Sequence, residues 1–274
     1  MKKIAVIGLG IIGGSLCGAL TNAGYSVDGF DNDISAMDYA LKAGYIQNKA
    51  ENLQNYEVVF LALPPMATIE YLDNAKFKDG ALVCDICGVK ESIEKVVYQT
   101  PRNYRYVGLH PMAGKETSGI VSATPNLFTN ANLIITRAEH TDDSAIAQVK
   151  EYALSIGFGN IIECSANEHD KKIALTSQLA HIVSNAYVKS EQVQECESFT
   201  GGSFQDMTRI AGVDEKIWTP LYGLNRENII NELTVLIDNL SEYRNALVEE
   251  DDIKLMRLLE QGRKIREKIK RKYN

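Results

Sequence analysis

The chain has 274 residues, enough to bury a large core in one or two domains. Its formal net charge of -7, from 29 Lys and Arg against 36 Asp and Glu, argues against the global basic surface of a nucleic-acid-binding protein. Five cysteines are an odd number in a chain too long to need disulfide staples. We therefore expect a cytoplasmic protein without nucleic-acid or membrane partners.

A Cys-x-x-Cys pair occurs at Cys84 and Cys87. No second pair and no flanking histidines follow at the spacing of zinc ligands. We interpret both cysteines as buried or loop thiols and expect no metal site.

The start of the chain predicts a strand, a glycine turn, a helix and a second strand. The apolar strand Ile4–Ile7 leads into Gly8-Leu9-Gly10-Ile11-Ile12-Gly13, and a helix is expected over Ser15–Ala23. The strand Ser26–Phe30 follows and ends at Asp31, 23 positions after Gly8. This order, with an acid after the second strand, is the one that dinucleotide binding requires.

Each glycine of this turn has an expected role. Gly8 makes the tight turn, Gly10 lets the backbone approach a pyrophosphate, and Gly13 lets the helix pack against the strand. The free amides of the helix N-terminus would hold the phosphate charge. Asp31 would accept hydrogen bonds from a ribose diol and repel a 2′-phosphate, which favours NAD over NADP.

Apolar strands continue to alternate with helices up to Cys164. Such alternation predicts an α/β fold with a Rossmann-type, mainly parallel sheet covered on both faces, here assigned to residues 1–164. The further strands are expected at Glu57–Leu63, Ala81–Cys84, Tyr106–Leu109, Asn132–Thr136 and Asn160–Cys164, and helices at Thr68–Ala75, Glu91–Tyr98 and Asp143–Ser155.

Loops at the carboxyl ends of these strands are the expected ligand sites. His110 comes directly after one strand, and Pro111 is expected to end that strand; a loop-capping histidine is the structural alternative. Asp85 and Lys90 follow another strand, where a helix cap and a surface charge are favoured over chemistry. The cofactor contacts expected at this edge are Gly8, Gly10, Ile11, Ile12, Gly13, Asp31, Leu63 and Pro64.

After Cys164 the pattern becomes helical, and residues 165–274 are assigned to an all-helical domain. Apolar residues recur every three or four positions from Ile229 to Leu247, which predicts an amphipathic helix. Its apolar face would be buried in a symmetric homodimer or against the first domain. The last helix opens with acids and closes with bases, as suits the helix dipole, and its basic end is interpreted as solvated.

Several polar residues of the helical part are candidates for a site. Asp170 and His181 lie eleven positions apart on one predicted helix, and so nearly on one face. The segment Phe199–Ala211 contains the pair Gly201-Gly202 and has weak periodicity, which favours a binding loop. Arg209 could pair with both oxygens of a carboxylate, although a surface arginine is the alternative.

These features together resemble the prephenate dehydrogenase family, the enzymes of tyrosine biosynthesis, over nearly the whole chain. In that family a dinucleotide-binding domain precedes a helical dimerisation domain, so the resemblance implies a homodimer through the C-terminal helices. The matching motifs are Gly8–Gly13, Asp85–Lys90, His110-Pro111-Met112-Ala113-Gly114 with Glu116 and Ser118-Gly119, His169-Asp170, His181, and Thr208-Arg209 with Trp218.

The resemblance implies NAD-dependent oxidative decarboxylation of prephenate to 4-hydroxyphenylpyruvate. His110 would accept the proton of the ring hydroxyl, and Arg209 would hold a substrate carboxylate. Trp218 could reach across the dimer. The expected substrate contacts are Glu116, Asp170, His181, Gly202 and Trp218.

Two positions depart from the family pattern. Gly88 stands where many relatives have a serine that assists the catalytic histidine, and Gln178 replaces the first histidine of a Ser-His-Leu-Pro-His motif. The alternatives left open are arogenate dehydrogenase, a β-hydroxyacid dehydrogenase with a catalytic lysine, and a non-enzymatic NAD-binding sensor. Direct inhibition by tyrosine is also left open.

Overall fold

The computed structural model describes residues 2–115 and 117–273. The chain forms two compact units, Met1–Asn225 and Arg226–Asn274. Among the described residues, no helix is both long enough and apolar enough to cross a membrane.

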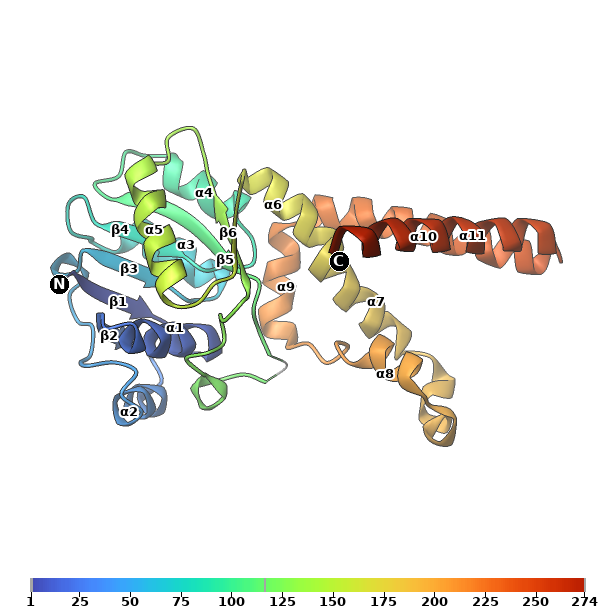
Figure 1. The fold of residues 1–274 in the computed structure, drawn as a ribbon, viewed down its shortest axis with the longest axis horizontal. Helices are drawn as coiled ribbons and strands as arrows, with labels where there is room; N and C mark the ends of the chain where they lie inside the picture. Colours follow the sequence, from blue (N-terminus) through green and yellow to red (C-terminus); the bar gives the residue numbers. More distant parts are fainter. Residues whose placement is uncertain (1, 116, 274) are drawn as a thin grey trace. The chain divides into compact units, whose positions relative to one another are not determined.

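The first unit contains a sheet of seven strands in the order β2-β1-β3-β4-β5-β6-β7 (Figure 1). Neighbouring strands run parallel except β5 and β6, which are antiparallel. This confirms the mainly parallel sheet predicted from the sequence. The strands are β1 (Lys3–Ile7), β2 (Ser26–Phe30), β3 (Val58–Leu61), β4 (Leu82–Asp85), β5 (Arg105–Pro111), β6 (Asn132–Thr136) and β7 (Asn160–Cys164).

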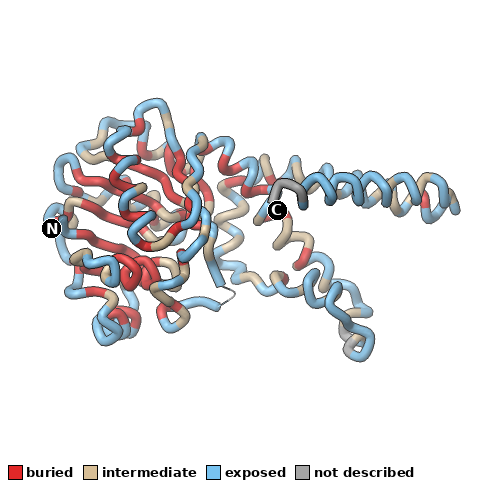
Figure 2. The backbone as a smooth tube through the Cα atoms, in the orientation of Figure 1, coloured by how far each residue is buried: buried red, intermediate tan, exposed pale blue. Residues whose placement is uncertain are grey.

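Helices cover both faces of the sheet and form two separate cores with it. Side chains of α1, α2 and α5 pack on one face, and those of α3 and α4 pack on the other. Figure 2 shows the buried residues concentrated along the strands. The helices are α1 (Ile11–Asn22), α2 (Ile34–Lys42), α3 (Pro65–Asn74), α4 (Glu91–Tyr98) and α5 (Asp143–Ser155), with 3-10 turns η1 (Leu53–Asn55) and η2 (Ile120–Ser122).

Three details of the first unit differ from the sequence prediction. Helix α1 begins at Ile11, directly at the glycine turn, rather than at Ser15. Helix α2 was not expected. Strand β5 continues through Pro111, which pairs in register with Leu133 of β6 instead of ending the strand. Proline has no N–H to donate, and it is tolerated there because the next amide, that of Met112, makes the bond to the Asn132 carbonyl at 2.8 Å.

Beyond the sheet the described chain is helical. The first unit continues through α6 (Ala166–Ile173), the π-helical turn η3 (Ala174–Gln178) and α7 (Leu179–Tyr187). The segment expected as a binding loop instead contains the short helix α8 (Gly202–Thr208). The domain boundary predicted after Cys164 stays a prediction. The sheet ends there, but the helices that follow belong to the same compact unit up to Asn225. The remaining elements are η4 (Glu191–Glu195), η5 (Glu197–Phe199) and α9 (Glu215–Leu224).

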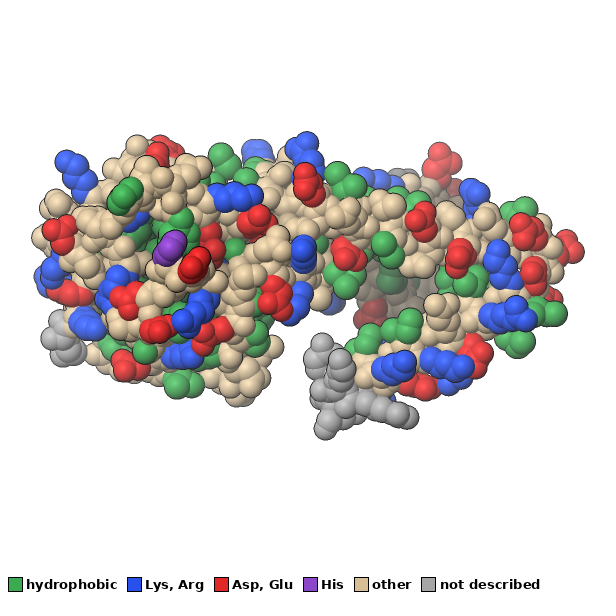
Figure 3. Space-filling view, turned by 90° about the horizontal axis from the view of Figure 1, so that it is seen from above, with side chains coloured by type: hydrophobic (Ala, Val, Ile, Leu, Met, Phe, Trp, Pro, Cys, Tyr) green, Lys and Arg blue, Asp and Glu red, His purple; other side chains and the backbone are tan. Residues whose placement is uncertain are grey.

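The second unit consists of α10 (Arg226–Val248) and α11 (Asp252–Tyr273), which pack against each other. The Tyr243 hydroxyl donates to the Leu258 carbonyl across this pair, at 3.2 Å. Figure 2 colours most of both helices as exposed, and Figure 3 shows hydrophobic side chains exposed between acidic and basic ones on the face it draws. Exposed apolar side chains here include Ile230, Val235, Ile237, Leu240, Leu247, Ile253, Met256 and Leu259.

Candidate active site

The glycine turn between β1 and α1 has the geometry of a phosphate-binding loop. Gly8 has a φ of +93°, and a Cβ there would lie 2.3 Å from the Ala62 carbonyl oxygen. A Cβ on Gly13 would lie 1.8 Å from the Gly8 oxygen, so the helix packs too closely to the strand for any side chain. A Cβ on Gly10 would meet nothing within 4 Å. The backbone is therefore open at the position where a pyrophosphate would approach.

The N-terminus of α1 begins in this open space. Gly10 is its N-cap residue, and no side chain caps the helix. The first amides of a helix carry partial positive charge and bind anions when no side chain occupies them. Ile11 and Ile12 are the first residues of the helix, so their backbone lies at the expected phosphate position.

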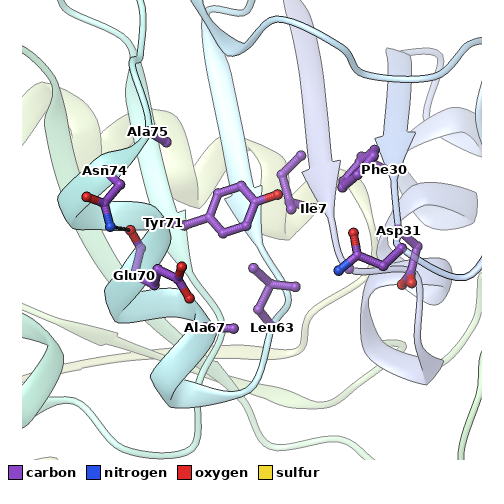
Figure 4. Close-up of a pocket in the computed structure, with 11 residues that line it drawn as sticks. Ile7, Phe30, Asp31, Leu63, Ala67, Glu70, Tyr71, Asn74 and Ala75 are labelled. Carbon is purple, nitrogen blue, oxygen red and sulfur yellow. Dashed lines mark hydrogen bonds between the residues drawn. The ribbon is translucent and has the colours of Figure 1, made fainter.

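A pocket of about 430 Å³ opens beside the turn. It is lined by Gly8, Asp31, Leu63 and Tyr71 among others, and Figure 4 shows Tyr71 reaching from α3 toward Ile7. Pro64, the N-cap residue of α3, follows Leu63 directly. The residues that the sequence assigned to the cofactor thus come from the carboxyl edge of β1, β2 and β3.

Asp31 ties the second strand to the glycine turn. One carboxylate oxygen accepts from the Leu9 amide at 2.7 Å, and the other accepts from the Asp33 amide at 2.8 Å. A carboxylate has about four acceptor positions, so it can still accept hydrogen bonds from a diol. The backbone bonds hold the negative charge at the edge of the pocket.

His110 lies near the end of β5 and is joined to a second histidine. Its Nδ1 lies 2.8 Å from Nε2 of His169, and the Nδ1 of His169 lies 2.6 Å from Oδ1 of Asp170. Burial, then the nearby His169 and then Lys90, hold the pKa of His110 well below its usual 6.5. His110 is therefore neutral at physiological pH, as a proton acceptor must be.

Asp170 is buried, and its two carboxylate oxygens bind the N-terminus of α4. Oδ1 accepts from the Lys90 amide and Oδ2 from the Glu91 amide, each at 2.9 Å. Asp170 is thus a helix cap for another element, and its geometry supports His169 more directly than it supports a substrate. The π-helical turn η3 lies between Asp170 and His181 and changes the helical register, so their spacing of eleven positions no longer implies a shared face.

Asp85 and Lys90 form a fully buried ion pair at 2.5 Å, so the expectation of a surface charge at Lys90 is wrong. The Tyr106 hydroxyl donates to the other oxygen of Asp85 at 2.5 Å. Burial and the Asp85 charge raise the pKa of Tyr106 well above 10. The pair fixes the loop that follows β4, and the positive charge of Lys90 disfavours protonation of His110.

His181 and Trp218 lie together in the helical part of the first unit. Their ring centroids are 4.1 Å apart, and His181 Nδ1 donates to the Ile210 carbonyl at 2.9 Å. Nε2 of a neutral His181 is then an acceptor. Trp218 therefore contacts His181 of its own chain.

Arg209 immediately precedes Ile210 and is exposed. It is the C-cap residue of α8, and Gly202 is the first residue of the same helix. Gly202 and Arg209 thus mark the start and the C-cap of α8, and the carbonyl that accepts from His181 belongs to the next residue, Ile210. Glu116, the remaining substrate contact expected from the sequence, lies outside the described residues.

Gly88 lies beside His110. A Cβ on Gly88 would be 3.7 Å from His110 Nε2 and 3.6 Å from Leu221 Cδ1 of α9. Gly88 thus lies between His110 and Leu221 of α9, the helix that also carries Trp218. Cys84 and Cys87 are buried, as expected, and the described residues include no cluster of potential metal ligands.

His169 was missed as a functional candidate. The sequence showed it next to Asp170 in a family motif, but nothing in its spacing from His110 predicts a contact across 59 positions. Only the packing of α6 against the sheet brings the two rings together.

Two domain families cover most of the chain. Residues 16–162 match the nucleotide-binding domain of prephenate dehydrogenase, and residues 165–261 match the prephenate dehydrogenase dimerization domain.

Individual relatives match along nearly the full chain. A prephenate dehydrogenase of Lactococcus lactis subsp. cremoris is 30% identical over 97% of this chain and 77% of its own length. The crystal structure of prephenate dehydrogenase from A. aeolicus in complex with hydroxyphenyl propionate and NAD+ has a TM-score of 0.85 at 25% identity, covering 98% of both chains. Synechocystis arogenate dehydrogenase has a TM-score of 0.78 at 25% identity, covering 97% of this chain and 99% of that one.

Proposed function

The chain belongs to the prephenate dehydrogenase family, and we propose that it catalyses the NAD-dependent oxidative decarboxylation of prephenate to 4-hydroxyphenylpyruvate. The observation that carries the proposal is the state and the position of His110. It is a neutral imidazole at the carboxyl edge of a nucleotide-binding sheet, and its Nε2, on the Gly88 side of the ring, is the nitrogen that does not face His169.

The residues of the glycine turn fit a dinucleotide. Gly10 leaves the space for a pyrophosphate, the N-terminus of α1 supplies free amides, and Asp31 lies where a ribose would hydrogen-bond. The Asp31 carboxylate would repel a 2′-phosphate, which supports NAD over NADP. When bound, NAD supplies the acceptor for the hydride.

His110 handles the proton of the reaction. Hydride loss from the ring carbon that bears the hydroxyl leaves positive charge there, and His110 Nε2 takes the hydroxyl proton as the charge develops. Loss of the ring carboxylate as carbon dioxide then makes the ring aromatic, and the proton returns to the phenolate oxygen. The balance is prephenate plus NAD+ giving 4-hydroxyphenylpyruvate, carbon dioxide and NADH.

The remaining substrate contacts come from the helical part. Arg209 would pair with a substrate carboxylate through its planar guanidinium. His181, with Nε2 as acceptor, and Trp218 would form one wall, and Gly202 would allow close approach of the backbone. Glu116 and Asp170 complete the proposed set, with Asp170 acting through His169.

We also propose that the active form is a homodimer. The match to a dimerization domain and the exposed apolar side chains of α10 and α11 support this proposal. A second copy of the chain is the natural cover for these side chains, because large exposed apolar surfaces mark interaction sites.

The test is to measure NADH formation and carbon dioxide release by the purified protein with prephenate, and separately with arogenate. The proposal expects equal amounts of both products with prephenate and NAD. Turnover with arogenate alone would keep the reaction class and change the substrate, in line with the similarity to Synechocystis arogenate dehydrogenase. NADH without carbon dioxide would contradict the proposed reaction.

A further inference from the structure

The second ring nitrogen of His110 has a partner that the proposed reaction does not use. His110 Nδ1 faces Nε2 of His169 at 2.8 Å, with the ring centroids 5.0 Å apart. His169 is almost fully buried. A buried histidine with both ring nitrogens engaged has a fixed orientation, so it can determine which nitrogen of its neighbour carries the proton.

Asp170 determines which atoms donate and which accept in the hydrogen bonds from Asp170 through His169 to His110. Its carboxylate is held by the Lys90 and Glu91 amides at the N-terminus of α4. An ionised carboxylate only accepts hydrogen bonds, so the Nδ1 of His169 must carry the proton of the 2.6 Å bond to Asp170. In a neutral His169 the other nitrogen, Nε2, is then the acceptor.

The proton on His110 follows from this direction. Because His169 Nε2 accepts, His110 Nδ1 must donate, and His110 Nε2 is left with the free electron pair. Nε2 is also the nitrogen beside Gly88, where a Cβ would still be 3.7 Å away. The basic nitrogen is therefore the one on the Gly88 side of the ring, away from His169, and it is the nitrogen that can accept the proton of a substrate hydroxyl.

We propose that His169, anchored by Asp170, is a positioning residue that holds His110 in the tautomer with its proton on Nδ1 and so presents Nε2 as the base. The proposal rests on the proposed function for the identity of the reaction. It also explains how His110 is oriented in a chain that has Gly88 where many family members have a serine.

The opposite arrangement makes a distinct prediction. If His169 carried protons on both nitrogens, it would donate to His110 Nδ1, and a neutral His110 would carry its proton on Nε2. That tautomer could not accept a proton from the substrate at Nε2. The tautomer of His110 therefore decides between the two arrangements.

Nitrogen NMR of protein labelled with 15N-histidine reads the tautomer without any substrate. The chain has four histidines, and the His110→Asn spectrum identifies the signals of His110. We expect native His110 at neutral pH to show a protonated Nδ1 and an unprotonated Nε2. A protonated Nε2 would overturn the proposal.

Variants at His169 test whether this residue determines the tautomer of His110. His169→Leu removes the acceptor, so His110 should become a mixture of tautomers and kcat should fall about tenfold or more, while the affinity for NAD is unchanged. In His169→Gln the amide oxygen can still accept from His110 Nδ1, so the native tautomer and part of kcat should be retained. His140→Leu, at a loop histidine that contacts Tyr98, is the matched control and should leave both unchanged.

The two readouts separate this proposal from the proposed function. A native tautomer that is lost in His169→Leu supports the positioning role even if neither prephenate nor arogenate is turned over, in which case the proposed reaction alone fails. An unchanged His110 tautomer and an unchanged kcat in His169→Leu would overturn the positioning role even in an active enzyme.

Discussion

At the scale of single residues, Asp31 is the group that should select the cofactor. Its carboxylate lines the 430 Å³ pocket and is held there by the Leu9 and Asp33 amides. Because a carboxylate that accepts from a ribose diol also repels a 2′-phosphate, we expect this one side chain both to favour NAD and to disfavour NADP.

Asp31→Ser should therefore narrow the preference for NAD. We expect kcat/KM for NAD to fall and that for NADP to rise, because the substitution removes both the acceptor and the repulsion. The ratio of the two kcat/KM values measures the change. Asp33→Ser, two residues away, removes a carboxylate that caps α2 and is the control. An unaltered ratio in Asp31→Ser would assign ribose recognition to another residue.

The pH dependence of the reaction should report the low pKa of His110. Burial, His169 and Lys90 all disfavour its protonated form, so the base stays unprotonated as the pH falls to and below 6.5, the usual pKa of histidine. We expect kcat/KM to remain level through this range and to fall only at more acidic pH. A loss of activity centred at or above pH 6.5 would mean that His110 is not the group that titrates.

The residue scale is also where sequence reasoning reached least far. Asp31, His110 and Arg209 could be identified from the sequence. Asp31 and His110 are polar residues at the ends of apolar strands, and Arg209 lies in a segment with weak periodicity. The contact of His169 with His110 and the burial of Lys90 depend on which helix packs where, and periodicity does not carry that information.

At the scale of elements, buried polar contacts hold the loop between β4 and α4 in place. Lys90 pairs with Asp85 in full burial, and Asp170 caps the first amides of α4. Breaking a buried ion pair by removing one partner leaves an uncompensated charge, which costs far more than the pair contributes.

Lys90→Met should accordingly destabilise the protein by about 3 to 5 kcal/mol, the usual cost of removing one partner of a buried pair. Urea unfolding measures the free energy. Lys95→Met is the matched control, because Lys95 is exposed and pairs with Glu91 at the surface; its effect should stay within about 1 kcal/mol. Equal losses of unfolding free energy in the two variants would contradict the prediction that breaking the buried pair costs more than breaking the surface pair.

The elements themselves were largely predictable. All seven strands were expected, because continuous apolar runs between polar turns are typical of a buried parallel sheet. The register change at η3 was not, because a π-helical turn leaves no clear mark in an apolar pattern. The end of β5 was misplaced because Pro111 stays in the strand, where the amide of Met112 and not an N–H of residue 111 makes the bond to Asn132.

At the scale of the whole molecule, the exposed apolar side chains of α10 and α11 need a cover. Leu240 is 58% exposed and Leu247 is 62% exposed. Burying a leucine side chain is worth about 1.5 to 3 kcal/mol, so a few such residues, counted twice in a symmetric dimer, contribute substantially to association.

Leu240→Glu should weaken the dimer, because each interface would bury two new carboxylates. Sedimentation should show the native protein with the mass of two chains and the variant shifted toward one. Glu242→Gln, at a neighbouring exposed position of α10, is the control and should remain dimeric. A native protein with the mass of one chain would contradict the dimer.

The most direct test of the account is the kcat of His110→Asn with prephenate and NAD, measured beside the affinity for NAD. Asparagine keeps a polar side chain at the site but cannot accept the proton of the hydroxyl at neutral pH. We expect kcat to fall about a hundredfold or more, by the usual worth of general base catalysis, with NAD bound as tightly as before. An unchanged kcat in a variant that binds NAD normally would contradict the role of His110 and with it the proposed mechanism.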